Sequence, residues 1–336
     1  MVAPLSKSTM RTCPHCDSLL GARAVACSAC FRSTAVCGGF RLGEELGHGG
    51  LGTVFAAETD AGQPAAVKVL ALSALNPSNV LHVFCDSARL LATLAHPGLP
   101  RVLGVEAHEH RSFLALERLD GGTLAQRVMA GKRFADADLH ALLDELLAVV
   151  AHLHDRRILH GDVTPRNVMF RAGEPRPVLI DFDGIAADGI ARSPTLVITP
   201  GYTAPEQRTG EVSVEADLYG IGATVYYAAT GRSPNSLERH GGRPDLSRVR
   251  ADAVTKAVLG ALLHLDPARR PSSAALARRL LAQAVAAEIP VRLAPPRRRV
   301  FATLVAAALA AAIGITLAIG TSYAAPMERP TPTGQR

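Results

Sequence analysis

The pattern of hydrophobic and polar positions divides the chain after its N-terminal segment, residues 10–38, into three zones. Residues 40–287 alternate strand-like and helix-like apolar segments punctuated by glycine and proline, which predicts a domain with both sheet and helix. Residues 300–319 carry no charged side chain, and an uncharged run of about twenty residues matches the hydrocarbon thickness of a bilayer when it is helical. Residues 288–299 between them are rich in proline and arginine, which is typical of a linker.

The uncharged run predicts a membrane anchor. Arg297–Arg299 precede it directly, whereas the tail behind it has only Arg329 and Arg336. This asymmetry follows the positive-inside rule, so we expect a single-pass helix over 300–323, a cytoplasmic domain before it and a short outer tail over 324–336. A buried helix of a soluble domain is the alternative, because alanine is only weakly apolar. The polar N-terminus argues against a signal peptide.

Composition limits the classes of function. The chain has 336 residues, of which 48% are hydrophobic, so a sizeable core is available. The net charge of +6 is compatible with binding to nucleic acid. However, the basic residues are scattered, they form no stripe interleaved with aromatics, and tryptophan is absent, so nucleic-acid binding is not expected.

Two C-x-x-C pairs lie in the N-terminal segment, residues 10–38. Two tight turns that each offer two thiolates can close a tetrahedral site, which suits structural zinc. Disulfides fit poorly with a cytoplasmic location, and redox C-x-x-C motifs usually occur singly. Whether Cys37 or His15 joins the site stays open. The predicted zinc ligands are Cys13, Cys16, Cys27 and Cys30.

A glycine-rich turn within residues 42–58 predicts a phosphate-binding loop between two strands, because glycine lets backbone N–H groups approach phosphate oxygens. A dinucleotide site would open a helix at this point, whereas residues 54–57 continue as a strand. Lys68 follows in an apolar strand, where burial is costly unless the lysine meets an anion such as ATP phosphate. A surface lysine is the alternative. The predicted loop residues are Gly47, His48, Gly49, Gly50, Leu51, Gly52 and Val54.

Residues 160–167 resemble the catalytic loop of protein kinases, and Asp181 lies where that family has its metal-binding D-F-G segment. Phosphoryl transfer needs a carboxylate that orients the attacking hydroxyl, and hard oxygen ligands for magnesium. The resemblance therefore implies that Asp162 is the catalytic base, that Lys68 and Asn167 are also catalytic, and that Asn167 and Asp181 bind Mg²⁺ or Mn²⁺. Separately, each could be an ordinary turn former or helix cap.

Residues 199–207 resemble the end of a protein-kinase activation segment. The resemblance implies that Thr199 packs beside the catalytic aspartate and that Glu206 pairs with Arg270. It also implies a lobe connector in which the backbone of Glu117 and Leu119 meets adenine.

The likeness covers residues 40–287 and is nearest to bacterial, membrane-anchored Ser/Thr protein kinases. It implies an α+β, two-lobed fold with a small β-rich N-lobe and a large helical C-lobe. This fold is joined to the N-terminal cysteine segment, residues 10–38, which resembles a small zinc ribbon, and to the transmembrane helix.

Four positions depart from the family pattern. In the family, a glutamate on a helix of the small lobe pairs with the strand lysine. That glutamate should fall near Ser87, and no glutamate occurs in the corresponding helix. Gly161 stands in place of the arginine that pairs with a phosphorylated loop, Thr164 in place of a phosphate-binding lysine, and Asp183 in place of the D-F-G glycine.

We expect an ATP-dependent Ser/Thr protein kinase of the non-RD type, acting on protein substrates at the cytoplasmic membrane. The departures leave two alternatives, a pseudokinase scaffold and an aminoglycoside- or choline-type small-molecule kinase. Whether the chain forms a homodimer, which protein it phosphorylates and what activates it stay open.

Overall fold

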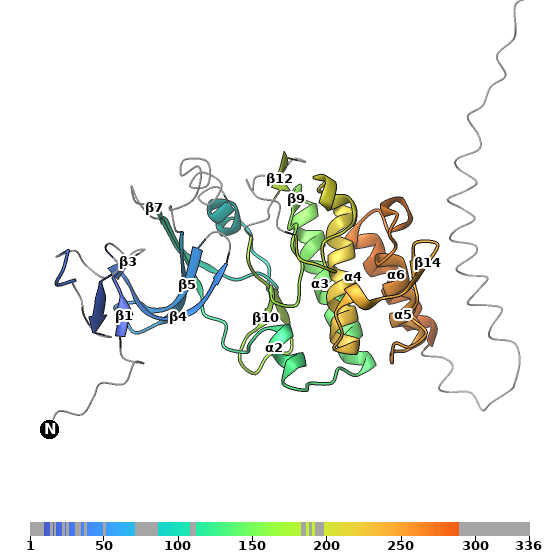
Figure 1. Ribbon diagram of the computed structural model, residues 1–336, viewed down its shortest axis with the longest axis horizontal. Helices are drawn as coiled ribbons and strands as arrows, with labels where there is room; N and C mark the ends of the chain where they lie inside the picture. Colours follow the sequence, from blue (N-terminus) through green and yellow to red (C-terminus); the bar gives the residue numbers. More distant parts are fainter. Residues whose placement is uncertain are drawn as a thin grey trace, which may run out of the picture. The chain divides into compact units, whose positions relative to one another are not determined.

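The structure is a computed structural model that describes residues 10–13, 16, 18–21, 24, 27–30, 35–36, 39–49, 52–70, 87–107, 112–182, 186–187, 190–191 and 198–288. The chain divides into two compact units, Met1–Val285 and Ala286–Arg336. The first unit contains a sheet lobe followed by a helical lobe (Figure 1).

The strands of the sheet lobe form one antiparallel sheet in the order β3-β4-β5-β6-β8-β7. Side chains alternate across a strand. In β6, Ala65, Val67 and Val69 are buried in the lobe core, so the opposite face carries Ala66 and Lys68. This alternation directs the lysine away from the apolar core. The strands are β3 Ala35–Val36, β4 Phe40–Gly49, β5 Gly52–Glu58, β6 Pro64–Leu70, β7 Val102–Ala107 and β8 Ser112–Glu117.

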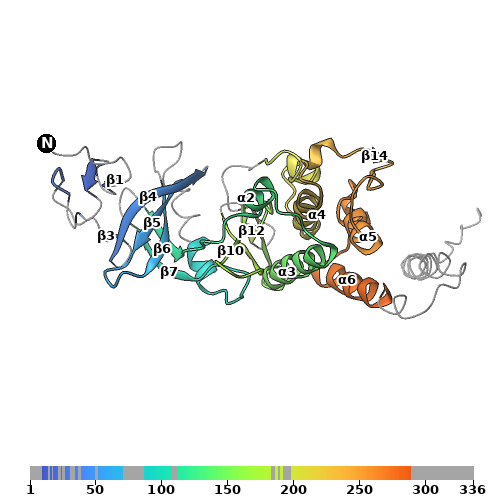
Figure 2. The same ribbon diagram turned by 90° about the horizontal axis from the view of Figure 1, so that it is seen from below.

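The helical lobe is built around α4, Val214–Thr230, which contacts both α3 and α5 (Figure 2). Most of α4 is buried, as expected of a helix that is apolar on nearly every side. Ser213 caps its first turn by accepting a hydrogen bond from the Ala216 N–H at 3.2 Å, and Gly231 ends it with φ 68°. The other helices are α2 Leu124–Met129, α3 Asp136–His154, α5 Ala253–Leu262 and α6 Ala274–Glu288.

Short elements connect the helices of this lobe and form its smaller sheets. The strands are β9 Ile158–Leu159, β10 Val168–Phe170, β11 Pro177–Leu179, β12 Ala186–Ala187, β13 Ile190–Ala191, β14 Arg239–His240 and β15 Arg243–Pro244. The 3-10 helices are η2 Glu206–Thr209, η3 Pro234–Ser236 and η4 Pro267–Arg269. Of these, β10 matters most for function, because it follows directly after Asn167 and pairs with β11.

The sheet lobe and the helical lobe confirm the predicted two-lobed α+β fold. The predicted strand over 54–57 lies within β5. Ahead of the sheet, β1 Met10–Thr12 and β2 Leu19–Gly21 form a hairpin that carries cysteines, and β3 adds an edge strand beside β4.

Within the described ranges, no helix has both the length and the hydropathy that a membrane crossing requires. The predicted span over 300–323 lies outside those ranges and stays a prediction.

Candidate active site

A cavity of about 540 Å³ is lined by residues of the sheet lobe and of the helical lobe. From the sheet come His48 of the glycine turn and Lys68 of β6, and from the helical lobe come Asn167 and Asp181. The predicted connector lies along the same cavity, which Glu117 and Leu119 both line. These six predicted site residues, far apart in sequence, therefore share one pocket.

The glycine turn is only partly within the described residues. Gly47 pairs with Val54 and Gly49 with Gly52 across β4 and β5, and Gly47 and Val54 line the cavity. Gly50 and Leu51 lie outside the described residues, so their predicted phosphate contacts stay predictions.

The Nζ atom of Lys68 donates a hydrogen bond to Oδ1 of Asp181 at 2.8 Å. Asp181 has φ 64°, a left-handed backbone conformation that aspartate adopts more readily than most residues. Ser87, at the position where the resemblance predicts a glutamate, is buried and lines the same cavity. The lysine thus reaches across the cavity to a carboxylate of the other lobe.

Asp162 is held by side chains on both sides. Its Oδ1 accepts a hydrogen bond from Thr199 Oγ1 at 2.9 Å, and its Oδ2 accepts one from Asn167 Nδ2 at 2.7 Å. Burial raises the pKa of Asp162 above the usual carboxyl value, although the Thr199 hydrogen bond opposes the shift. A fixed carboxylate with a raised pKa is well suited to accept a proton from a hydroxyl.

Asn167 is oriented by the same contacts. Its amide nitrogen also donates to the Asp162 carbonyl at 2.9 Å. Among the described residues nothing donates to the amide oxygen of Asn167, and both Asn167 and Asp181 line the cavity. This amide oxygen and the Asp181 carboxylate are hard oxygen donors of the kind that magnesium prefers, so these residues fit a magnesium site.

Helix α4 holds the loop that carries Asp162. The Asp217 carboxylate, which is buried, accepts hydrogen bonds from the His160 N–H at 2.9 Å and the Gly161 N–H at 2.8 Å. One turn further, a β-carbon on Gly220 would lie 3.0 Å from the Val163 carbonyl oxygen, and the Thr224 hydroxyl donates to that oxygen at 3.1 Å. Residues three, four and seven apart share one face of a helix, so one face of α4 supports residues 160–163 of the loop.

Burial alone would raise the pKa of Asp217, but the His154 hydrogen bond and the neighbouring charges outweigh it and hold the pKa below its usual value. The Nε2 of His154 and Oδ2 of Asp217 lie 2.9 Å apart. Gly161 has φ 79°, a conformation that glycine adopts at little steric cost.

The predicted activation-segment residues lie close to these groups. Glu206 forms a bidentate ion pair with Arg270, with Nη2 3.1 Å from Oε2, and both side chains are buried. Gln207 Nε2 donates to the Gly161 carbonyl at 2.9 Å and so ties this segment to the catalytic loop.

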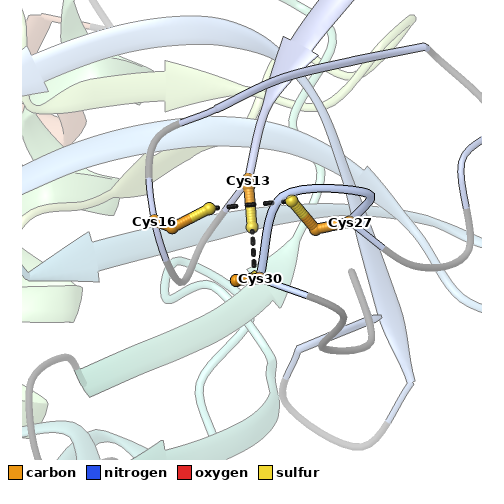
Figure 3. A group of neighbouring side chains, drawn as sticks. All are labelled: Cys13, Cys16, Cys27 and Cys30. Atoms are coloured by element: carbon orange, nitrogen blue, oxygen red, sulfur yellow. Dashed lines mark hydrogen bonds between the residues drawn. The ribbon is translucent and has the colours of Figure 1, made fainter.

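The four N-terminal cysteines form a second candidate site (Figure 3). Their sulfur atoms all lie within 4.8 Å of one another, with Cys13 and Cys30, and likewise Cys16 and Cys27, 3.6 Å apart. A disulfide needs about 2.05 Å, whereas sulfurs at about 2.3 Å from one zinc ion in a tetrahedron are roughly 3.8 Å apart. The cluster therefore fits a tetrahedral metal ion. His15 and Cys37 lie outside the described residues.

Sequence reasoning missed the residues that support the site. Gln207 follows directly after a predicted residue, but its contact with Gly161 depends on the fold. Arg171 and Arg101, which both contact the Glu117 carboxylate, have no motif that could have identified them.

Comparisons with known proteins agree with this geometry. A sequence model described as a protein kinase domain matches residues 40–284. The chain is 31% identical over 245 residues to serine/threonine-protein kinase C of Synechocystis sp., covering 65% of this chain and 46% of that protein. It is 30% identical over 266 residues to serine/threonine-protein kinase pkn2 of Myxococcus xanthus, covering 72% and 32%.

A third relative is the DNA damage-responsive serine/threonine-protein kinase RqkA of Deinococcus radiodurans, at 31% identity over 277 residues, covering 73% of this chain and 39% of that protein. The chain thus spans less than half of the length of each of these curated relatives.

Proposed function

Because the chain belongs to the protein kinase family, we propose that it transfers the γ-phosphate of ATP to serine or threonine hydroxyls of protein substrates. The observation that carries this proposal is the placement of Asp162, which Asn167 and Thr199 fix from two sides. Named Ser/Thr protein kinases among the relatives support the same acceptor class.

In the proposed reaction the acceptor hydroxyl approaches Asp162. Its oxygen bonds to the γ-phosphorus while the bond from that phosphorus to the β,γ-bridging oxygen breaks, and ADP leaves. The hydroxyl proton passes to the Asp162 carboxylate. Lys68 lies in the same cavity, where its ammonium group balances phosphate charge. Asn167 and Asp181 would hold Mg²⁺, which would supply positive charge to neutralise the phosphate oxygens.

The proposal is tested with the full chain, radiolabelled ATP and a protein acceptor. We expect transfer by the native chain and a loss of at least about a hundredfold in Asp162→Asn, because general-base and orienting effects of this size are typical. Asp155→Asn is the matched control, since Asp155 is an exposed aspartate beyond the end of α3. Equal background from the native chain and Asp162→Asn would refute phosphate transfer.

Two alternatives make different predictions in this assay. A pseudokinase scaffold, which the residues at Ser87 and Thr164 favour, would bind ATP without transfer. A small-molecule kinase would phosphorylate an aminoglycoside or choline and no protein. The buried Glu206–Arg270 pair supports a protein acceptor, because it holds the segment that resembles the peptide-positioning part of protein kinases.

We further propose that Cys13, Cys16, Cys27 and Cys30 bind a structural zinc ion. The sulfur–sulfur separations support this, as does the hydrogen bond from the Ala29 N–H to Cys27 Sγ at 3.3 Å, because such bonds stabilise a ligand thiolate. The Ser18 hydrogen bond lowers the pKa of Cys16 to about 6, which favours its thiolate form.

A membrane anchor over 300–323, with the kinase domain in the cytoplasm, is the location that we propose. The uncharged run and the arginines before it support the proposal. Sedimentation of the full chain with membranes after a high-salt wash is the expected result, and recovery in the soluble fraction would contradict it.

A further inference from the structure

The connector between the lobes carries a buried carboxylate with several donors. Glu117, the last residue of β8, is 9% exposed. Its Oε1 accepts hydrogen bonds from Arg171 Nη2 at 2.6 Å and the Arg101 N–H at 3.1 Å, and its Oε2 accepts one from Arg101 Nε at 3.2 Å. A buried charge is costly unless it is paired and hydrogen-bonded, so this environment requires the carboxylate to be ionised.

Electrostatics agree with the geometry. Burial by itself would raise the pKa of Glu117, but the hydrogen bonds from Arg171 and Arg101 outweigh it and hold the pKa below its usual value. Arg101 is largely exposed, whereas Arg171 is mostly buried. Water can therefore substitute less easily for the Arg171 hydrogen bond to Glu117 than for those of Arg101.

Arg171 joins three segments of the chain. It follows directly after β10, and its Nη1 donates to the Pro97 carbonyl at 2.8 Å while its Nη2 reaches Glu117. Nη2 also lies 3.4 Å from the Leu99 carbonyl oxygen. The planar guanidinium fork suits such simultaneous contacts better than an ammonium group would.

The far end of the connector is attached to the same strand. The Gly121 N–H donates to the Phe170 carbonyl at 2.9 Å, and the Phe170 N–H donates to the Gly122 carbonyl at 3.1 Å. A β-carbon on Gly121 would lie 2.6 Å from the Phe170 carbonyl oxygen, so only glycine permits this approach. Both ends of the connector are thus held by the end of β10, with Leu119 between them at the cavity.

Strand β10 begins directly after Asn167, at the metal end of the cavity. Arg171 itself is not among the described residues that line the cavity. We propose that Arg171, acting through Glu117, is a positioning residue that fixes the connector relative to the catalytic loop and so sets the affinity of the pocket for adenine. The proposal rests on the proposed function in that the pocket takes an adenine nucleotide.

The test is the binding of adenosine and of Mg·ATP to the full chain by titration calorimetry, together with the KM for ATP and kcat. Arg171→Met keeps the bulk and removes the fork. We expect its affinities for adenosine and for ATP to fall by the same factor, roughly tenfold. We expect KM to rise accordingly and kcat at saturating ATP to change by less than about threefold, because Arg171 does not touch the reacting atoms.

Arg176→Met is the matched control. Arg176 pairs with Glu145 at 3.1 Å in the same lobe, that pair is partly exposed, and neither residue lines the cavity. We expect native affinity from this variant. If Arg171→Met does not fold, Arg171→Lys and Glu117→Gln replace it, since both keep the backbone of the connector and remove part of the contact.

Native adenosine affinity in a folded Arg171→Met, or in both substitute variants, would overturn the inference. A loss seen with ATP but not with adenosine would also overturn it, because Arg171 would then act at the phosphate end. If the native chain binds adenosine but transfers no phosphate, only the proposed transfer is refuted. The adenosine affinities of Arg171→Met and of the native chain then still test the inference. A native chain that binds no adenosine overturns the inference as well.

Discussion

The ammonium of Lys68 lies 2.8 Å from the Asp181 carboxylate, so the lysine of the sheet lobe contacts the proposed magnesium ligand of the helical lobe. The Lys68 side chain is 11% exposed and that of Asp181 is 35% exposed. The family resemblance predicts that this lysine pairs with a glutamate near position 87, and Ser87 lines the same cavity. The contact therefore joins the two lobes across the proposed nucleotide pocket.

Removal of the Lys68 charge should slow phosphate transfer. We expect Lys68→Met to reduce the rate at saturating Mg·ATP by roughly a hundredfold or more, a typical loss when one electrostatic group is removed from an active site. The measurement is the initial rate of radiolabel transfer. Lys132→Met is the control, because Lys132 is half exposed and pairs with Asp138 at 3.8 Å. A native rate in Lys68→Met would contradict the assignment.

Arg270 should be important for stability. Its side chain is 0% exposed and that of Glu206 is 8% exposed. Removing one member of a buried pair leaves an unpaired buried charge, so Arg270→Ala should lower the free energy of unfolding by about 3–5 kcal/mol. Denaturant unfolding measures the change.

Arg269, the residue before Arg270, provides the control for this prediction. Arg269 is 64% exposed and lies 3.5 Å from Asp266, so Arg269→Ala should cost no more than about 1 kcal/mol. Similar losses from the two variants would show that the Glu206 pair has no special role.

Substitution by alanine should lower activity at one helical glycine and raise stability at another. In α4, a β-carbon on Gly220 would lie 3.0 Å from the Val163 carbonyl oxygen, so Gly220→Ala must displace the catalytic loop by a few tenths of an ångström. In α5, a β-carbon on Gly260 would meet only Leu246, at 3.9 Å. We expect Gly220→Ala to lower kcat about tenfold. Gly260→Ala should keep kcat and raise stability by about 0.5–1 kcal/mol.

Measured kcat and thermal unfolding of both variants test this prediction. Loss of activity in both, or in neither, would mean that the approach of α4 to Val163 does not control the geometry of the loop.

Two histidines should make the protein sensitive to acid. Burial lowers the pKa of His96, helped by the charge of His152, and burial also lowers the pKa of His152. Their ring centroids are 5.0 Å apart. Below the ordinary histidine pKa of 6.5, the unfolded chain binds protons that the folded chain does not yet bind, so stability falls as the pH decreases through this range.

Unfolding free energies from pH 7.5 down to the acid range should therefore decrease, and His152→Gln should show a shallower decrease. An equal pH dependence in the variant and the native chain would assign the acid sensitivity to other groups.

Zinc should stabilise the N-terminal hairpin. We expect about one zinc ion per native chain by elemental analysis, since four thiolates fill a tetrahedral site. Cys27→Ser should lose the metal, whereas Cys85→Ser, the sixth cysteine, should keep it. Folded native chain without metal would rule out the zinc site.

Much of the site could be predicted from order and spacing along the chain. Asp162 and Asn167 were assigned through the family resemblance, and because they are close in sequence a local loop can place both near one substrate. The alternation within β6 directs Lys68 away from the core. The distant pair Glu206 and Arg270 was expected only through family resemblance, because no local pattern joins residues so far apart.

The sequence by itself determined the element types, the chemistry available at the nucleotide pocket and the likeness of four cysteines to a metal site. These depend on local periodicity and on side-chain type. Only the tertiary structure decided that Lys68 contacts Asp181, that one face of α4 carries the catalytic loop and that Arg171 holds Glu117. Such contacts arise when packing buries a charge or brings two backbones together, and burial is a property of the folded chain as a whole.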